Sequence, residues 1–84
     1  MDEQGKQLLI VDDDPGTREL LTRYLNEQGY SVEAVADGVA MDGYLATQSV
    51  DLIILDLMLP GEDGLAIARR LRMNGNIPII ILSA

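Results

Sequence analysis

Two groups of carboxylates lie directly after apolar segments of the sequence. The acidic pair Asp12 and Asp13 follows the apolar run 7–11. Asp56 follows a second apolar run, 52–55. Two carboxylates about 4 Å apart repel each other by roughly 4 kcal/mol at an effective dielectric constant near 20. If the two runs are neighbouring strands, the three side chains share one cleft, and a hard cation such as Mg²⁺, which takes oxygen ligands, would offset the repulsion.

Asp56 is the candidate for covalent chemistry. A carboxylate beside a bound metal ion can accept a phosphoryl group and form an acyl phosphate. We therefore interpret Asp56 as a phosphoacceptor whose charge is compensated by a cation that it shares with the acidic pair. A single Asp at the end of a strand is more commonly a turn or capping residue. Asp14, which precedes Pro15 at the expected start of a helix, is assigned to such a capping role.

The elements that must position these side chains alternate along the chain. The sequence predicts strands at 7–11, 30–36, 50–56 and 77–83, and helices at 18–28, 39–48 and 65–74. Alternating strands and helices with nearly continuous apolar strands are typical of a parallel sheet covered by helices on both faces. We therefore predict an α/β fold, in which ligands bind beside the carboxyl ends of the strands.

Local signals refine this assignment. The run 30–36 alternates in polarity and is expected at an edge of the sheet. Gly29 is placed where a helix ends, and Asp37-Gly38 is predicted to be a turn. In the segment LPGEDG, Asp63 is expected to cap the next helix and Gly64 to relieve crowding.

The helix 65–74 has an apolar and a basic side. Its apolar residues Leu65, Ile67, Ala68 and Leu71 are predicted to face the core. Its three arginines, Arg69, Arg70 and Arg72, are predicted to face solvent.

Composition limits the possible functions. The chain has 84 residues, which is enough for one domain, and a net charge of −8 from 14 acidic and 6 basic residues. This charge argues against direct nucleic acid binding by this segment, because binding to phosphates needs Lys and Arg. The sequence has no Cys and no His. It shows neither a secretory signal nor an apolar run that could span a bilayer, so we expect no membrane contact and a cytoplasmic location.

The motifs together resemble a known family. The segments LLIVDDDP, YSVEAVADG, VDLIILDLMLPGEDGLAIARRLR and IPIIILSA resemble the receiver domain of bacterial two-component response regulators over residues 7–84. The stretch LDLMLPGEDGL is similar to the OmpR-type transcription-factor subclass. The resemblance implies a flavodoxin-like (CheY-like) fold with strand order 2-1-3-4-5. It also implies phosphorylation by a histidine kinase, a transcriptional output, and a signalling role rather than an enzymatic one.

The resemblance also implies roles for individual residues. Asp56 matches the phosphoacceptor, Asp13 the direct Mg²⁺ ligand, and Asp12 an acidic partner that acts largely through water. The backbone carbonyl of Met58 matches a further metal ligand. A switch is implied as well, with Ser83 as the hydroxyl that turns toward the phosphoryl group and Ala84 as the small residue that follows it.

Compared with the family, residues 1–84 correspond to the N-terminal portion of a single receiver domain. The last helix-strand-helix of the family, with its lysine, has no counterpart in this sequence, and Lys6 precedes the first strand. We therefore expect a truncated form in which phosphorylation is impaired. We also expect a homo-oligomer or swapped dimer through the exposed fourth strand, because open apolar strand edges pair with other chains.

Two alternatives stay open. The chain could be a non-signalling receiver fragment that acts only as a folding or assembly module. It could also be a Mg²⁺-dependent phosphatase of the haloacid-dehalogenase type, because LLIVDDDPGT resembles the motif of that family, with Asp12 as nucleophile and Asp14 as acid/base. Pro15 stands where that family usually has Gly.

Overall fold

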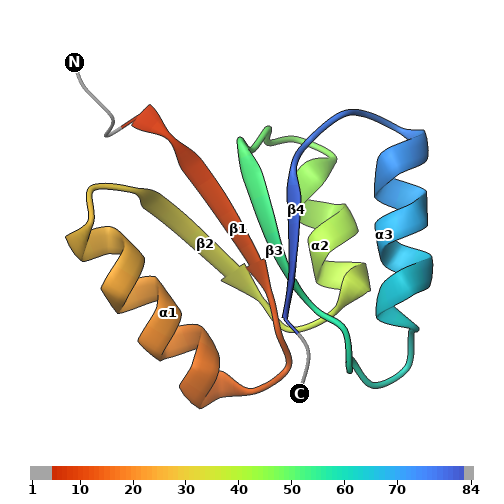
Figure 1. Cartoon of the computed structure of the whole chain (residues 1–84), viewed down its shortest axis with the longest axis horizontal. Coiled ribbons are helices and arrows are strands. Elements are labelled where there is room, and N and C mark those ends of the chain that lie inside the picture. The colour runs from red at the N-terminus through yellow and green to blue at the C-terminus, as the bar shows by residue number, and fades with distance from the viewer. Residues whose placement is uncertain (1–4, 83–84) are drawn as a thin grey trace.

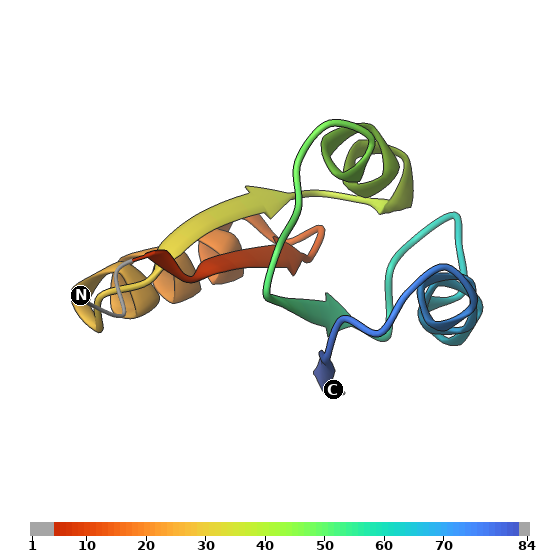
Figure 2. The same cartoon turned by 90° about the horizontal axis from the view of Figure 1, so that it is seen from above.

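The computed structural model describes residues 5–82 and contains one parallel sheet with the strand order β2-β1-β3-β4. Helix α1 covers one face of the sheet, whereas α2 and α3 cover the other (Figures 1 and 2). In chain order the elements are β1 (Gln7–Val11), α1 (Pro15–Glu27), β2 (Ser31–Val35), α2 (Gly38–Leu45), β3 (Leu52–Asp56), α3 (Gly64–Met73) and β4 (Ile79–Leu82). The predicted α/β architecture is confirmed.

Strand β1 lies inside the sheet, between β2 and β3. Its residues Leu9, Ile10 and Val11 are fully buried, as expected for a strand covered on both faces. Val11 is paired with Val35 of β2 on one side and with Leu55 of β3 on the other. Strand β2 is more exposed and lies at one edge of the sheet, which confirms the edge position predicted from its alternating pattern.

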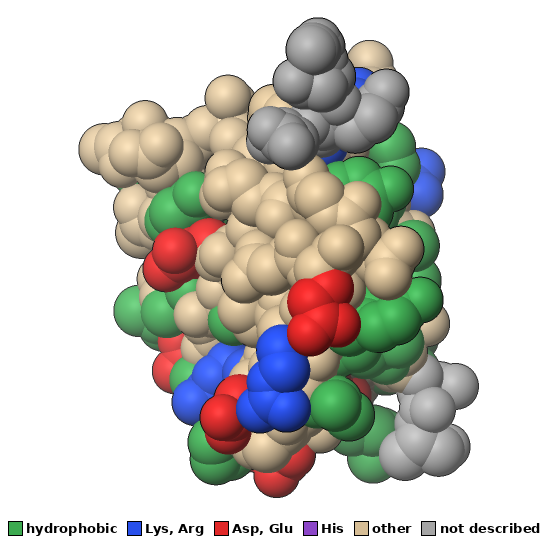
Figure 3. Space-filling view, turned by 90° about the vertical axis from the view of Figure 1, so that its left-hand side faces the viewer, with side chains coloured by type: hydrophobic (Ala, Val, Ile, Leu, Met, Phe, Trp, Pro, Cys, Tyr) green, Lys and Arg blue, Asp and Glu red, His purple; other side chains and the backbone are tan. Residues whose placement is uncertain are grey.

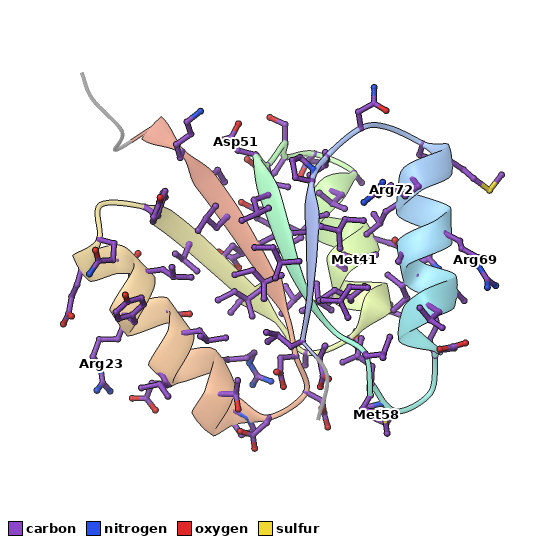
Figure 4. The ribbon with its side chains drawn as sticks, in the orientation of Figure 1. Arg23, Met41, Asp51, Met58, Arg69 and Arg72 are labelled. Carbon is purple, nitrogen blue, oxygen red and sulfur yellow. The ribbon has the colours of Figure 1, made fainter. Side chains whose placement is uncertain are left out.

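The main core lies between the sheet and the helix pair α2 and α3. Met41 points from α2 into this layer (Figure 4) and is fully buried. The buried residues of the core cluster are Leu9, Val11, Met41, Val50, Ile53, Leu55, Leu59 and Ile67. Because α2 and α3 share this layer with β3, the core holds the end of β3 against both helices.

Helix α1 packs less deeply on the opposite face. None of its residues is fully buried, and Leu20 and Tyr24 are more than half exposed. On its outer surface Arg23 forms an ion pair with Glu19 at 3.3 Å, and acidic and basic side chains lie close together on this side of the molecule (Figure 3). Such an exposed pair contributes little to stability.

The start of α1 follows the predicted capping pattern. The Asp14 side chain accepts hydrogen bonds from the backbone N–H and the hydroxyl of Thr17, both at 2.7 Å, and Pro15 is the first helical residue. These hydrogen bonds hold the pKa of Asp14 below its usual value, because they favour the charged form. Gly29 follows the helix with φ of 99°, a conformation that suits glycine.

Some boundaries differ from the sequence predictions. Helix α1 extends to Pro15, as the predicted Asp14 cap requires, beyond the periodic run 18–28, and α2 ends at Leu45 rather than at residue 48. Asp37 is the N-cap of α2, where its side chain accepts from the Ala40 N–H at 2.8 Å, so it is more than the turn residue that we predicted. The described part of the fourth strand begins at Ile79 rather than at residue 77.

Two orientations predicted for α3 are wrong. Leu65 was expected in the core but is 46% exposed, because it lies along a surface groove beside Ile79 and Ile81 of β4. Arg70 was expected in solvent but is only half-buried and binds carboxylates of other elements. Ile67 is buried as predicted. Among residues 5–82, no helix combines the length and the apolar character that crossing a membrane requires.

Gly64 at the start of α3 lies directly against the backbone of the preceding loop. A Cβ atom built at this position would be 2.7 Å from the Cα and the carbonyl oxygen of Leu57. By contrast, a Cβ atom at Gly43 of α2 would meet nothing within 4 Å. The crowding predicted at Gly64 is therefore confirmed.

We predict opposite effects of alanine at these two glycines. Gly64→Ala should lower the free energy of unfolding by about 1–3 kcal/mol, since backbone atoms would have to shift. Gly43→Ala should raise it by about 0.5–1 kcal/mol, since alanine loses less conformational entropy on folding than glycine. Urea titration followed by circular dichroism measures both changes. Equal effects of the two variants would contradict the tight packing at Gly64.

Candidate functional site

The predicted acidic cluster forms at the carboxyl end of the sheet. Asp12 follows β1 directly and Asp56 is the last residue of β3, and the two strands are adjacent and in register. Asp12, Asp13 and Asp56 each offer a carboxylate oxygen, and these oxygens all lie within 4.8 Å of one another. Parallel pairing of β1 with β3 therefore brings together three side chains that are far apart in sequence.

Each acidic residue has a distinct environment. Asp12 is only 5% exposed, Asp56 is partly buried and Asp13 is exposed. The Asp12 carboxylate accepts a hydrogen bond from the Asp14 N–H at 2.9 Å, and the Asp56 carboxylate accepts one from the Met58 N–H at 2.9 Å. The backbone thus holds the buried Asp12 carboxylate in place. The exposed Asp13 carboxylate is accessible to a ligand.

No ion pair among residues 5–82 compensates the charge of the cluster. None of the three carboxylates forms an ion pair with a described Lys or Arg side chain. Burying a charge without such compensation is unfavourable. A cation bound among these oxygens would remove the repulsion that the fold imposes.

The spacing of the oxygens suits Mg²⁺. The ion binds oxygen ligands at about 2.0–2.1 Å, so two oxygens on the same ion are at most about 4.2 Å apart. The cluster, with its oxygens within 4.8 Å of one another, is only slightly wider than this limit. A small inward movement, or a water molecule between one carboxylate and the ion, would complete the coordination.

Arg18 lies beside the site and was not identified from the sequence. Its guanidinium donates a hydrogen bond to the backbone carbonyl of Asp12 at 2.9 Å, and it is partly buried. The contact ties the first turn of α1 to the end of β1 and places a positive charge near the cluster. The available signal was an arginine in the first turn of the helix that follows the acidic strand end.

The remaining predicted site residues have different outcomes. The Asp14 carboxylate is engaged with Thr17, so its capping role is confirmed and nothing in its position favours the acid/base role of the phosphatase alternative. Met58 lies in the loop after β3 with its side chain largely exposed (Figure 4), and the role of its carbonyl stays a prediction. Ser83 and Ala84 lie outside the described residues.

Comparison of the sequence with known proteins supports one family. The family model of the response regulator receiver domain matches residues 8–84. The chain is 44% identical over 79 residues to the response regulator MprA of Mycobacterium sp. (strain KMS), which covers 93% of this chain and 34% of that protein. The chain therefore spans about a third of the length of the curated relatives that it matches.

Solved structures share the fold. Response regulator protein TrrA from Thermotoga maritima, in complex with Mg²⁺ and BeF, is 38% identical with a TM-score of 0.87, over 94% of this chain and 70% of that one. TrrA in complex with histidine kinase ThkA has a TM-score of 0.86 at 38% identity, over 94% of this chain and 69% of that one. With the family model matching nearly the whole chain, the protein belongs to the response regulator receiver domains of two-component systems.

Proposed function

We propose that Asp56 accepts a phosphoryl group from a histidine kinase in the presence of Mg²⁺, and that this modification controls a transcriptional output. The observation that carries the proposal is the convergence of the oxygens of Asp12, Asp13 and Asp56 within 4.8 Å at the carboxyl end of the sheet. Similarity to TrrA, whose structures include a Mg²⁺–BeF complex and a kinase complex, supports it. The transcriptional output rests on the motif resemblance to the OmpR-type subclass.

Asp56 is the nucleophile in this proposal. One of its carboxylate oxygens attacks the phosphorus atom, the bond from phosphorus to the imidazole nitrogen of the kinase breaks, and that nitrogen keeps the electron pair. The product is an acyl phosphate. The Met58 N–H donates to Oδ1 of Asp56, which orients the carboxylate and leaves Oδ2 free of that hydrogen bond.

The other acidic residues hold the cation. The resemblance to the family implies that Asp13, which is exposed, would bind Mg²⁺ directly and that the buried Asp12 would act largely through water. The Met58 carbonyl would add a further oxygen ligand. When bound, Mg²⁺ neutralises charge on the phosphoryl oxygens during transfer. The proposed compartment is the cytoplasm, where a histidine kinase would find its ATP.

We predict that phosphorylation depends on Asp56 and on the metal ion. Incubation with acetyl phosphate and Mg²⁺ should add the mass of one phosphoryl group to a fraction of the protein, in keeping with the impaired phosphorylation expected from the sequence. Intact mass spectrometry measures this fraction. Asp56→Asn should abolish the gain because it removes the nucleophile, and chelation of Mg²⁺ should abolish it too.

Asp51→Asn is the matched control. Asp51 lies just before the start of β3, at the opposite end of the strand from Met58 (Figure 4). This variant should be labelled like the wild type. Labelling that persists in Asp56→Asn and maps to Asp12 would contradict the proposal and favour the phosphatase alternative. A folded chain that gains no mass would favour the non-signalling module.

The second proposed partner of this 84-residue chain is another copy of itself, paired through β4. Among the described residues, β4 has a neighbouring strand on one side only. Ile80 and Ile81 of this strand are 49% and 41% exposed. Apolar side chains of α3, among them Leu65 and Met73, continue this surface. An antiparallel β4–β4 contact would satisfy the free backbone groups and cover these side chains.

We predict that light scattering will show a dimer whose population rises with protein concentration. Ile81→Lys should yield a monomer, because a lysine on an edge strand opposes pairing. Val39→Lys is the control, since Val39 lies on α2, is 80% exposed and should leave the dimer intact. Circular dichroism verifies that both variants fold. A wild-type monomer at every concentration would contradict this proposal.

A further inference from the structure

The loop 57–63 joins the phosphoacceptor strand to α3 and has few apolar anchors. Leu59 is buried in the core cluster, whereas Met58 and Pro60 are exposed. Gly61 adopts a φ of 83° within it. Because Met58 donates its N–H to Asp56, the conformation of this loop sets the geometry of the site. Burial of one leucine leaves most of that conformation to be explained by other contacts.

Arg70 of α3 binds two carboxylates from different elements. Its Nη1 atom donates to Glu62 in the loop, and its Nη2 atom donates to both carboxylate oxygens of Asp42 in α2, at 3.2 and 3.1 Å. We call these three residues, Asp42, Glu62 and Arg70, the Arg70 bridge. It connects α2, α3 and the loop after β3 through one guanidinium group.

The bridge uses the planar shape of arginine. The two terminal nitrogens of a guanidinium present their N–H groups in fixed directions, so one side chain can hold two carboxylates at once. The Glu62 hydrogen bond, followed by that of Asp42, raises the pKa of Arg70 above its usual value. A lysine has the same charge but holds its donors on a single flexible atom.

The bridge is partly shielded from water. The side chains of Arg70, Glu62 and Asp42 are 35%, 37% and 57% exposed. Isolated exposed pairs are worth little, but a network of three charges in defined geometry can contribute more. The shielding of Arg70 and Glu62 therefore makes their contact the stronger arm of the bridge.

Glu62 also lies close to the start of α2. Its Oε1 atom lies directly over Gly38 at the start of α2, so that a Cβ atom at Gly38 would overlap it. Gly64, two residues after Glu62, is packed against the backbone of Leu57. The end of the loop thus lies against α2 at Glu62 and packs onto its own beginning at Gly64.

We infer that Arg70 is a positioning residue for the phosphoryl and metal site, acting through Glu62 on the loop that carries Met58. This inference rests on the proposed function. In addition to their packing in the core, α2 and α3 would then help to fix the positions of the metal ligands through Asp42 and Arg70. Loss of the bridge leaves the acidic residues in place and loosens the loop beside them.

Substitution of Arg70 tests the inference with two matched controls on the same helix. Arg69 and Arg72 are exposed and form no ion pair within the described part of the chain. In the full 84-residue chain, Arg70→Gln should weaken Mg²⁺ binding by about tenfold, the low end for residues that orient metal ligands. The amide shifts of Asp13 and Met58 in an NMR titration measure this affinity. Arg69→Gln and Arg72→Gln should bind Mg²⁺ like the wild type.

Amide hydrogen exchange provides a readout without metal. Exchange in the loop 57–63 should accelerate in Arg70→Gln and in Glu62→Gln, while exchange in β1 stays unchanged. The double variant should show no further acceleration, because the two residues act through one contact. Arg70→Lys should restore the charge but not the slow exchange, since lysine does not hold both carboxylates.

Three outcomes would overturn the inference. One is an equal rate of amide exchange in the loop 57–63 in Arg70→Gln and in Arg69→Gln. If Arg70→Gln also had a lower free energy of unfolding, this result would indicate that the ion pair is purely structural. Another is full restoration by Arg70→Lys. The third is additivity of Arg70→Gln and Glu62→Gln. A wild-type chain that binds no Mg²⁺ would instead contradict the proposed function, and the exchange measurements would still decide the role of Arg70.

Discussion

The in-register parallel pairing of β1 with β3 is the constraint on which the site depends. Leu55 lies opposite Val11, so the residues that follow these two positions reach the same end of the sheet. Asp12 and Asp56 then carry their carboxylates into one small region, where no described basic side chain pairs with them. A shift of one residue in this register would turn one of these side chains to the opposite face of the sheet.

The acidic residues of the chain are found in three different environments. Asp42 and Glu62 share Arg70, so their charges are partly compensated within the protein. The acidic cluster at the strand ends forms no ion pair with a described basic residue, and this is the physical reason to assign a cation to it. Capping aspartates form a further group, because their charges are held by helix N-terminal N–H groups. Acidic residues of the same type thus separate into structural and functional groups by their partners.

Sequence patterns predicted the element order, the parallel sheet, the edge position of β2 and the acidic cluster. These succeeded because strand burial and helix capping depend on residues near in sequence, such as Asp14, Pro15 and Thr17. The orientation of Leu65 and Arg70 was predicted wrongly. Helical periodicity shows which residues lie on the same side of α3. It does not show which part of that side is covered by neighbouring elements.

Residue types at fixed spacing along the chain are enough to reveal the resemblance to the family, the fold class and the residues that could bind a hard cation. Which charges meet depends on how the helices and strands pack. The tertiary structure brought Arg18 to the carbonyl of Asp12 and placed Arg70 between Asp42 and Glu62. Asp42 and Arg70 are 28 residues apart, and their contact requires α2 and α3 to lie side by side on one face of the sheet. No periodicity within a single helix encodes that placement, since it results from the packing of both helices on the core.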